Sequence, residues 1–361
     1  MNTNISCQEA ILLLSHHPKI GSQTIKKLHY LCDGDLSRVF DLEQDKLNLI
    51  NKNLAEILNT VRKYSLEKIL SVLKKHDIGY ITYLDSCYPE RLSEAKDAPA
   101  ILFIKGNIES LNKESIAVVG SRKYSSYGAR ICRRIVSKIS ESPLVVVSGL
   151  ALGIDSIAHQ TTLENNGTTI AVLGCGLDVV YPVSNSALAR AIIHSGGALI
   201  SEYPPKTEPF KSNFPARNRI IAALSLGTLV VEAAKQSGAI ITAMSALEYN
   251  REVFAIPGPI DSPYSEGCNY LIQQGAKLVM EPNDIFSELN IEQLHSVKKA
   301  KNELKPNQEE QAIIEIIKGK SMSCDEICRI SGINVATISQ ILTMLEMKGI
   351  LENVGGIWRE K

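Results

Sequence analysis

The stretch SIAVVGSRKYSSYGARICRRIVSKISESPLVVVSG, residues 115–149, decides the fold. Ser115–Val119 is a short run rich in small and β-branched apolar residues, which is typical of a buried strand. Residues 127–140 have apolar side chains at helical spacing, and residues 144–147 are a second buried strand. A strand, a helix and a second strand in succession are the unit from which parallel sheets covered by helices are built.

The same alternation continues on both sides of this stretch. Two short strands precede it, and further strands alternate with helices after it. The pattern predicts a mostly parallel, Rossmann-like sheet with helices on both faces, over residues 76–286. The other expected strands are residues 78–82, 100–105, 169–173, 198–201, 228–231 and 252–256, and the other expected helices are residues 155–165, 184–195, 215–224 and 237–250.

Small residues follow three of the predicted strands, at Gly120–Ser121, Ser148–Gly149 and residues 174–176. Ligands of such sheets bind beyond the carboxyl ends of the strands, where small residues allow a close approach. Arg122 comes next and is expected to reach over this edge of the sheet. Residues 174–176 lack the third glycine of the dinucleotide fingerprint, and no GxxxxGK[ST] occurs. Ordinary NAD or ATP binding is therefore disfavoured, and no cofactor is expected.

A second stretch, FKSNFPARNRIIAALS at residues 210–225, predicts an anion site. Pro215 is expected to begin a helix, because the amide that proline lacks would be unpaired there anyway. The free N–H groups of a helix start suit a phosphate, arginines add forked donors, and a phenylalanine ring can stack on a base. An ordinary exposed helix start fits the same pattern. The candidate residues are Lys211, Phe214, Arg217, Asn218 and Arg219.

The helix predicted over residues 127–140 is strongly basic. Between residues 116 and 147 the only acidic residue is Glu141. Basic residues recur at spacings of three and four, which places them on about one helical face. A solvated surface and a binding surface both fit this arrangement. The residues are Arg130, Arg133, Arg134 and Lys138.

The two ends of the chain have their own patterns. Residues 1–75 have helical periodicity and a short match to a helix-hairpin-helix, and we favour a small helical packing domain of the SAM or helix-hairpin-helix type. Residues 287–306 are polar and contain Lys298, Lys299, Lys301 and Lys305, as in a linker. Residues 307–361 predict a winged helix-turn-helix. Acids outnumber bases in it, which favours a protein-contacting or structural module over a DNA reader.

Composition sets broad limits. The 361 residues have no net formal charge, so a basic surface must be local. The eight cysteines form no CxxC and no paired Cys/His spacing of a zinc site, and no metal is expected. We find no targeting segment and no apolar run long enough to span a membrane. These features favour a soluble protein of the reducing cytoplasm.

Eight motifs stand in order along the chain: AVVGSR (117–122), SGLALGIDSIAH (148–159), LGCGLDVVYPVSN (173–185), SEYPP (201–205), FPARNRIIAALS (214–225), VVEAAKQSGAIITA (230–243), REVFAIPGPI (251–260) and GCNYLIQQGAKLV (267–279). With these motifs the sequence resembles the DprA (Smf) family of bacterial DNA-processing proteins, over essentially the whole chain. The resemblance implies a protein, not an enzyme, that binds single-stranded DNA, shields it from nucleases and helps load a RecA-type recombinase during natural transformation or recombination. It also implies homodimers formed through the Rossmann-like domain.

The predicted site combines this resemblance with the analysis of the residues. The resemblance implies a single-stranded DNA pocket that includes Gly120, Ser121, Arg122, Lys211, Phe214, Arg217, Asn218, Ser237 and Gly238. The residue patterns add Ser148, Gly149 and Arg219. Stacking and phosphate contacts carry little base information, so binding is expected to tolerate any sequence.

Two other functions are compatible with parts of the sequence. GTLVVE at residues 227–232 has one glycine of the signature of nucleoside-monophosphate phosphoribohydrolases, with Glu232 as a possible catalytic carboxylate. The alternative role for Glu232 is to hold an arginine of the pocket. A winged-helix transcription regulator is the third possibility, and the acidity of residues 307–361 argues against it.

Overall fold

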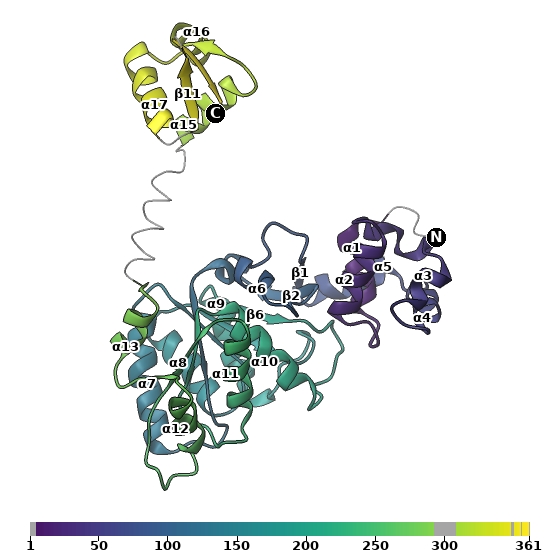
Figure 1. Cartoon of the computed structure of the whole chain (residues 1–361), viewed down its shortest axis with the longest axis vertical. Coiled ribbons are helices and arrows are strands. Elements are labelled where there is room, and N and C mark those ends of the chain that lie inside the picture. The colour runs from purple at the N-terminus through teal and green to yellow at the C-terminus, as the bar shows by residue number, and fades with distance from the viewer. Residues whose placement is uncertain (1–4, 292–307, 348–349, 355, 361) are drawn as a thin grey trace. The chain divides into compact units, whose positions relative to one another are not determined.

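The computed structural model describes residues 5–291, 308–347, 350–354 and 356–360. The chain divides into two compact units, Met1–Leu289 and Asn290–Lys361 (Figure 1). Most of the predicted linker, including Lys298, Lys299, Lys301 and Lys305, lies outside the described residues. The domain boundaries at residues 75, 286 and 306 stay predictions.

Helices form the first part of the larger unit, as their periodicity predicts. Leu12 and Leu14 are fully buried in a hydrophobic cluster that also contains Phe103 and Leu199 of the central sheet. The N-terminal helices therefore pack directly against the α/β part. They are α1 (Cys7–Ser15), α2 (Ser22–Leu31), η1 (Leu36–Asp41), α3 (Gln44–Asn48), α4 (Leu54–Val61) and α5 (Leu66–Lys75).

The stretch that resembles a helix-hairpin-helix, residues 18–28, has packing partners. At the start of α2, the hydroxyl of Ser22 donates a 2.6 Å hydrogen bond to Oε1 of Glu202 and accepts one of 2.8 Å from the amide of Ala100. A carboxylate at this helix start repels a phosphate. The contacts thus favour the packing role over a phosphate site.

In the described residues, nine strands form the central sheet, in the order β1-β2-β6-β5-β4-β3-β7-β8-β9. The pairings from β6 through to β9 are parallel, whereas β2 pairs antiparallel with β6 and with β1. The predicted mostly parallel sheet is confirmed. The strands are β1 (Gly79–Thr82), β2 (Ile101–Gly106), β3 (Ser115–Val119), β4 (Val145–Ser148), β5 (Thr169–Leu173), β6 (Ala198–Ser201), β7 (Gly227–Val230), β8 (Glu252–Ala255) and β9 (Lys277–Leu278).

Helices cover both faces of this sheet. Ala117 and Val119 of β3 share a hydrophobic cluster with α10 and α11, while the alternate residues Ile116 and Val118 are buried on the other face. The helices are α6 (Glu90–Ser93), η2 (Ile108–Asn112), α7 (Ser126–Ser140), α8 (Ile154–Glu164), η3 (Val183–Asn185), α9 (Ser186–His194), α10 (Asn213–Leu224), α11 (Gly238–Glu248), α12 (Glu266–Gln273) and α13 (Pro282–Glu288).

The start of α10 corrects one prediction. The helix begins at Asn213, not at Pro215, so Pro215 is the third helical residue. Proline is tolerated throughout a first turn because none of those amides has an intrahelical partner. Arg217 and Arg219 consequently lie in the second turn, where their directions differ from those of residues at the helix start.

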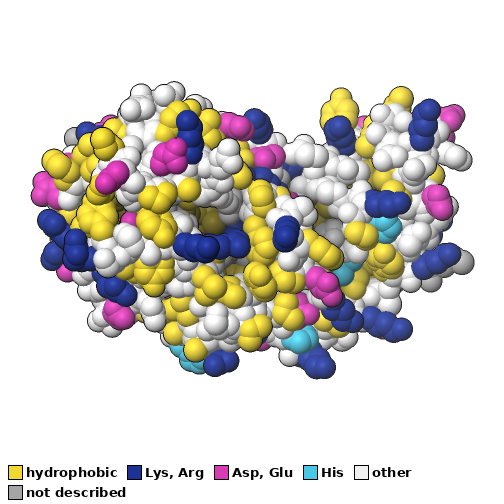
Figure 2. All heavy atoms as spheres, turned by 90° about the horizontal axis from the view of Figure 1, so that it is seen from below, with side chains coloured by type: hydrophobic (Ala, Val, Ile, Leu, Met, Phe, Trp, Pro, Cys, Tyr) yellow, Lys and Arg dark blue, Asp and Glu magenta, His cyan; other side chains and the backbone are white. Residues whose placement is uncertain are grey.

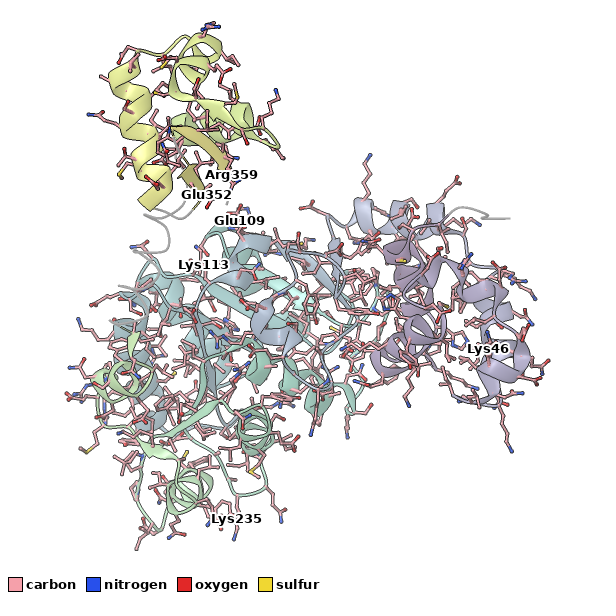
Figure 3. All side chains as sticks on the ribbon, turned by 45° about the horizontal axis from the view of Figure 1, so that its top comes forward. Lys46, Glu109, Lys113, Lys235, Glu352 and Arg359 are labelled. Carbon is pink, nitrogen blue, oxygen red and sulfur yellow. The ribbon has the colours of Figure 1, made fainter. Side chains whose placement is uncertain are left out.

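The smaller unit has the predicted winged-helix elements. A three-stranded sheet, β10-β12-β11, packs with the helices around Trp358 and Ile327. Arg359 and Glu352 pair across its neighbouring strands at 2.7 Å (Figure 3). Lys348 and Gly355 of the predicted module lie outside the described residues. The elements are α15 (Gln308–Ile317), β10 (Met322–Ser323), α16 (Cys324–Ser331), α17 (Val335–Met347), β11 (Leu351–Val354) and β12 (Ile357–Glu360).

Across the described part of the chain, every single helix falls short of the length and apolar character needed to cross a membrane, and only a bent pair, residues 324–331 with 335–346, meets that test by length and composition.

Candidate functional site

A cavity of about 790 Å³ opens at the carboxyl end of β3, between the first turns of α10 and α11. A hollow bordered by hydrophobic and by Lys or Arg side chains is visible on one face of the molecule (Figure 2). The cavity lining includes four basic side chains and one carboxylate: Arg122, Lys123, Lys211, Arg217 and Asp155. This composition favours an anionic ligand.

Two aromatic rings line the pocket. Phe214, on the first turn of α10, lies 5.6 Å from the ring of Tyr181, centroid to centroid, at a tilt of 35°. The guanidinium carbon of Arg122 lies 5.4 Å from the Phe214 centroid. A flat apolar surface beside an exposed cation is what a nucleotide needs, because the base stacks and the phosphate pairs.

Arg217 does not have the position that the sequence predicts. Its side chain is 4% exposed and points under the pocket, where Nη1 donates 2.7 Å to the carbonyl of Gly149 and also to the carbonyl of Val172. Burial lowers the pKa of Arg217 to about 10, and the buried carboxylate of Asp155 acts in the opposite direction. Burial likewise raises the pKa of Asp155. Arg217 thus joins α10 to the sheet and forms the floor of the pocket.

The predicted small residues mostly make room for protein atoms. A Cβ on Gly149 would come within 2.7 Å of the Arg217 guanidinium, and one on Gly120 within 2.7 Å of Ile154. Ser148 is buried and donates 2.6 Å to the carbonyl of Val118. Gly120 and Ser121 line the cavity, whereas Ser148 and Gly149 do not. Close packing of strands and helices therefore accounts for Ser148 and Gly149, and their contact with the ligand stays a prediction that the cavity lining does not support.

Arg219 lies outside the cavity. Its Nη2 donates to the carboxylate of Glu202, and its Nε lies 3.7 Å from Asp97. These two acids neutralise Arg219, which fastens α10 to the segments on either side of it. The expectation that Arg219 contacts DNA stays a prediction, and its ion pairs with Glu202 and Asp97 argue against it.

The start of α11 provides backbone donors. Gly238 is its first residue and is exposed in the cavity lining, and Ser237 precedes it. The Ser237 hydroxyl is buried without a hydrogen-bond partner among the described residues. Asn218 donates 3.1 Å to the carbonyl of Gly238, which holds α10 and α11 together at the pocket. An unpaired hydroxyl beside a helix N-terminus suits one phosphate oxygen.

Glu232 has a structural role. Its carboxylate accepts 2.9 Å from the amide and 2.5 Å from the hydroxyl of Ser125, the residue that caps α7. Both oxygens are occupied and the side chain is 2% exposed, outside the cavity lining. The partner is a helix cap and not the arginine that the sequence suggested. In this position Glu232 gives no support to a catalytic carboxylate.

Sequence reasoning missed Tyr181, Lys123 and Asp155. Tyr181 lies in the loop after β5, where the carboxyl-edge rule applies, and a tyrosine just before a proline could have been selected on that ground. Asp155 has no comparable signal, because its position beneath Arg217 depends on the packing of α8. Among the described residues, no group of three or more His, Cys, Asp or Glu side chains could hold a metal ion.

These features define a class: a Rossmann-like protein that carries an appended winged helix and a cationic, aromatic pocket at the carboxyl edge of its sheet. The chain belongs to the DNA recombination-mediator protein A family, whose model matches residues 79–290. The model of the DprA winged helix domain matches residues 297–356.

Relatives share long stretches with the chain. Protein Smf of Escherichia coli K12 is 41% identical over 277 residues, which are 77% of this chain and 73% of that protein. The crystal structure of DNA processing protein A from Streptococcus pneumoniae superimposes with a TM-score of 0.68 at 40% identity, over 79% of this chain and 98% of that one. A structure of the Helicobacter pylori protein, which concerns its single-stranded DNA binding mode, has a TM-score of 0.53 at 29% identity, over 59% and 97% of the two chains.

Proposed function

We propose that the pocket binds single-stranded DNA, and that the protein acts in recombination as a binding protein and not as an enzyme. The observation that carries the proposal is the combination around Phe214: a partly exposed ring, with the exposed cations Arg122 and Lys211 and the helix start at Gly238 in the same cavity. Bases stack on such rings while basic groups hold the backbone. The Helicobacter pylori relative, which binds single-stranded DNA, adds support.

The lining also supports a preference for single strands over duplexes. A base can reach the face of Phe214 or Tyr181 only when it is unstacked from its neighbours, which costs a duplex several kcal/mol but a single strand much less. The contacts offered are ring faces, cations and backbone amides, and these discriminate poorly between bases. Binding is therefore expected to be strong for any single-stranded sequence.

The test compares single- and double-stranded DNA of one sequence by fluorescence anisotropy with the full chain. We expect tighter single-strand binding that weakens steeply with salt, and a loss of at least tenfold in Arg122→Glu/Lys211→Glu. Lys68→Glu/Lys74→Glu on α5, which makes the same change in net charge, is the matched control and is expected to bind normally. Equal affinity for duplex, or equal losses in both double variants, would contradict the proposal.

Two further parts of the proposal concern partners. Homodimer formation through the α/β part is supported by an unpartnered stripe on α11, where Ile241, Met244 and Leu247 are each about half exposed at spacings of three. Sedimentation of Met244→Arg against the unmodified chain tests this, and an unchanged molecular mass would exclude the stripe as the interface.

The second part is protection of the bound strand from nucleases and its transfer to a RecA-type recombinase, during transformation or recombination. The family membership supports this role. Nuclease digestion of a labelled single strand, followed by assembly of recombinase filaments on DNA with and without the protein, measures both activities. Filament assembly at the same rate in both reactions would leave DNA binding as the whole function.

A further inference from the structure

Helix α7 carries a group of arginines that the pocket does not use. Arg130, Arg133 and Arg134 are exposed and lie in the second and third turns of α7. Within the described ranges, none of the three has a carboxylate within ion-pair distance. Arg130 instead lies over the ring of Tyr127, at 5.8 Å from its centroid.

Single arginines without an ion pair also occur elsewhere among the described residues, as at Arg62 and Arg190, but α7 groups three of them on one helix. Elsewhere in the described chain, arginines commonly lie beside a carboxylate, as do Arg38, Arg91, Arg219, Arg251 and Arg359. On α7 itself, Lys138 pairs with Glu141 at 2.8 Å, so the unpaired group ends before the last turn. An ordinary solvated surface would be expected to alternate signs of charge. The unpaired group therefore points to an anionic partner.

The group follows the pocket loop along the chain. Helix α7 follows β3 directly, so its N-terminus lies at the carboxyl edge of the sheet beside Arg122 and Lys123. Tyr124, between this loop and the helix, is 45% exposed. Because a helix rises about 1.5 Å per residue, Arg130 and Arg134 stand about 6 Å apart along α7. Cations and an exposed ring thus follow one another along the chain, from the pocket loop into α7.

Acids on the neighbouring elements do not compete for these arginines. The carboxylate of Asp284 on α13 accepts the amides of Met280 and Glu281, and Glu288 pairs with Lys277. Glu232, beneath the start of α7, is occupied by Ser125. On the side of α8, the amide oxygen of Asn165 accepts from the hydroxyl of Ser137, and the carbonyl of Ile154 lies 4.0 Å from the thiol of Cys132.

We propose that α7 binds the phosphate backbone of the strand as it leaves the pocket, so that the single-stranded DNA site is longer than the pocket. This inference rests on the proposed function and adds to it the path of the strand outside the pocket. The strand would contact the pocket with its bases and the arginines of α7 with phosphates alone. A flexible polyanion fits a row of exposed cations without any demand on sequence.

The test measures binding of oligothymidylates of about 6 and about 20 nucleotides, a range that spans typical single-strand site sizes. In Arg130→Ala/Arg133→Ala/Arg134→Ala, we expect the short strand to bind within about twofold of the unmodified protein. The long strand should bind about tenfold more weakly, with its salt slope reduced by about 2, which corresponds to three phosphates at about 0.7 each. The matched control is Lys68→Ala/Lys74→Ala/Lys75→Ala on α5, which removes the same charge.

Each outcome has one meaning. Equal losses for both lengths, with an unchanged thermal midpoint, would assign the arginines to the pocket and overturn the extended site. Unchanged binding of the long strand, or an equal loss in the α5 control, would also overturn it. Failure of the unmodified protein to bind either strand would refute the proposed function itself, which is a different result from a loss confined to the α7 variant.

Discussion

The rim and the floor of the pocket each hold an arginine near the ring of Phe214, and the two arginines have different roles: one is exposed to a ligand and the other holds the fold together. Arg122 at the rim is exposed, with its guanidinium carbon 5.4 Å from the ring. Arg217 in the floor lies 6.0 Å from the same ring but is buried and donates to backbone carbonyls. A cation on a strand-end loop stays available to a ligand, whereas one in the second turn of a packed helix holds the fold together.

The largest expected effect comes from the floor. Arg217→Ala removes the donor to two buried carbonyls and leaves Asp155 without its neighbouring positive charge. We expect the free energy of unfolding to fall by about 3 kcal/mol, measured by urea denaturation. Arg122→Ala, the matched change at the rim, should leave it within about 0.5 kcal/mol. If both variants were equally stable, the division into rim and floor would be wrong.

A second prediction concerns pH, because α8 carries a fully buried histidine outside the cavity lining. His159 is fully buried with Nδ1 2.7 Å from Oγ1 of Thr169, and burial lowers its pKa from 6.5 to about 3. The unfolded chain therefore binds a proton below pH 6.5 that the folded chain does not, and stability falls as the pH drops from 6.5 towards 3. Each pH unit is worth about 1.4 kcal/mol, so pH 5 should cost about 2 kcal/mol.

The control for this effect is His159→Gln, which keeps an amide for Thr169 but does not titrate. Its stability is expected to change less between pH 7 and pH 5 than that of the unmodified chain, by about 2 kcal/mol. If the free energy of unfolding changed with pH in the same way for both proteins, the pKa of His159 would not be lowered by burial.

The contrast also separates what a sequence can reveal from what it cannot. The run at Ser115–Val119 predicts a buried strand because β-branched and apolar residues are a local property, and the edge rule then places Arg122 at the ligand side. The roles of Lys211 and Phe214 follow from the same local logic together with the family motifs. All three line the cavity.

The features of the site that the sequence did not predict depend on where side chains point and not on the type of residue. Arg217 and Arg219 are two residues apart on α10, so they point about 200° away from each other around the helix axis, at 3.6 residues per turn. One arginine therefore points under the pocket and the other towards Glu202. The partner of Glu232 likewise depends on residues far away in the sequence. Ser125 lies beside Glu232 because β3, which precedes Ser125, pairs with β7, which precedes Glu232.

Aromatic contacts at the rim should be smaller in effect than the floor contacts and independent of salt. Phe214→Ala is expected to weaken single-strand binding by about 1–2 kcal/mol with an unchanged salt slope, because a stacked base releases no counterions. Tyr181→Ala tests whether the second ring also stacks. Phe210→Ala is the control, since Phe210 is 57% exposed but outside the cavity lining. A loss in Phe210→Ala equal to that in Phe214→Ala would mean that general apolar surface, and not this pocket, binds the strand.

The smallest expected effect comes from a comparison of Arg122 with Arg219, which the sequence predicts to belong to the same site. Arg122 lines the cavity without a carboxylate partner among the described residues, whereas Arg219 is held by Glu202 and Asp97 outside it. Arg122→Ala should weaken single-strand binding about tenfold and reduce the salt slope by about 0.7, the share of one phosphate. Arg219→Ala should change neither, because its charge is already neutralised by two acids of the same chain. A reduced salt slope in Arg219→Ala would mean that DNA competes with Glu202 for this arginine, and the binding surface would then extend from the pocket towards the N-terminal helices.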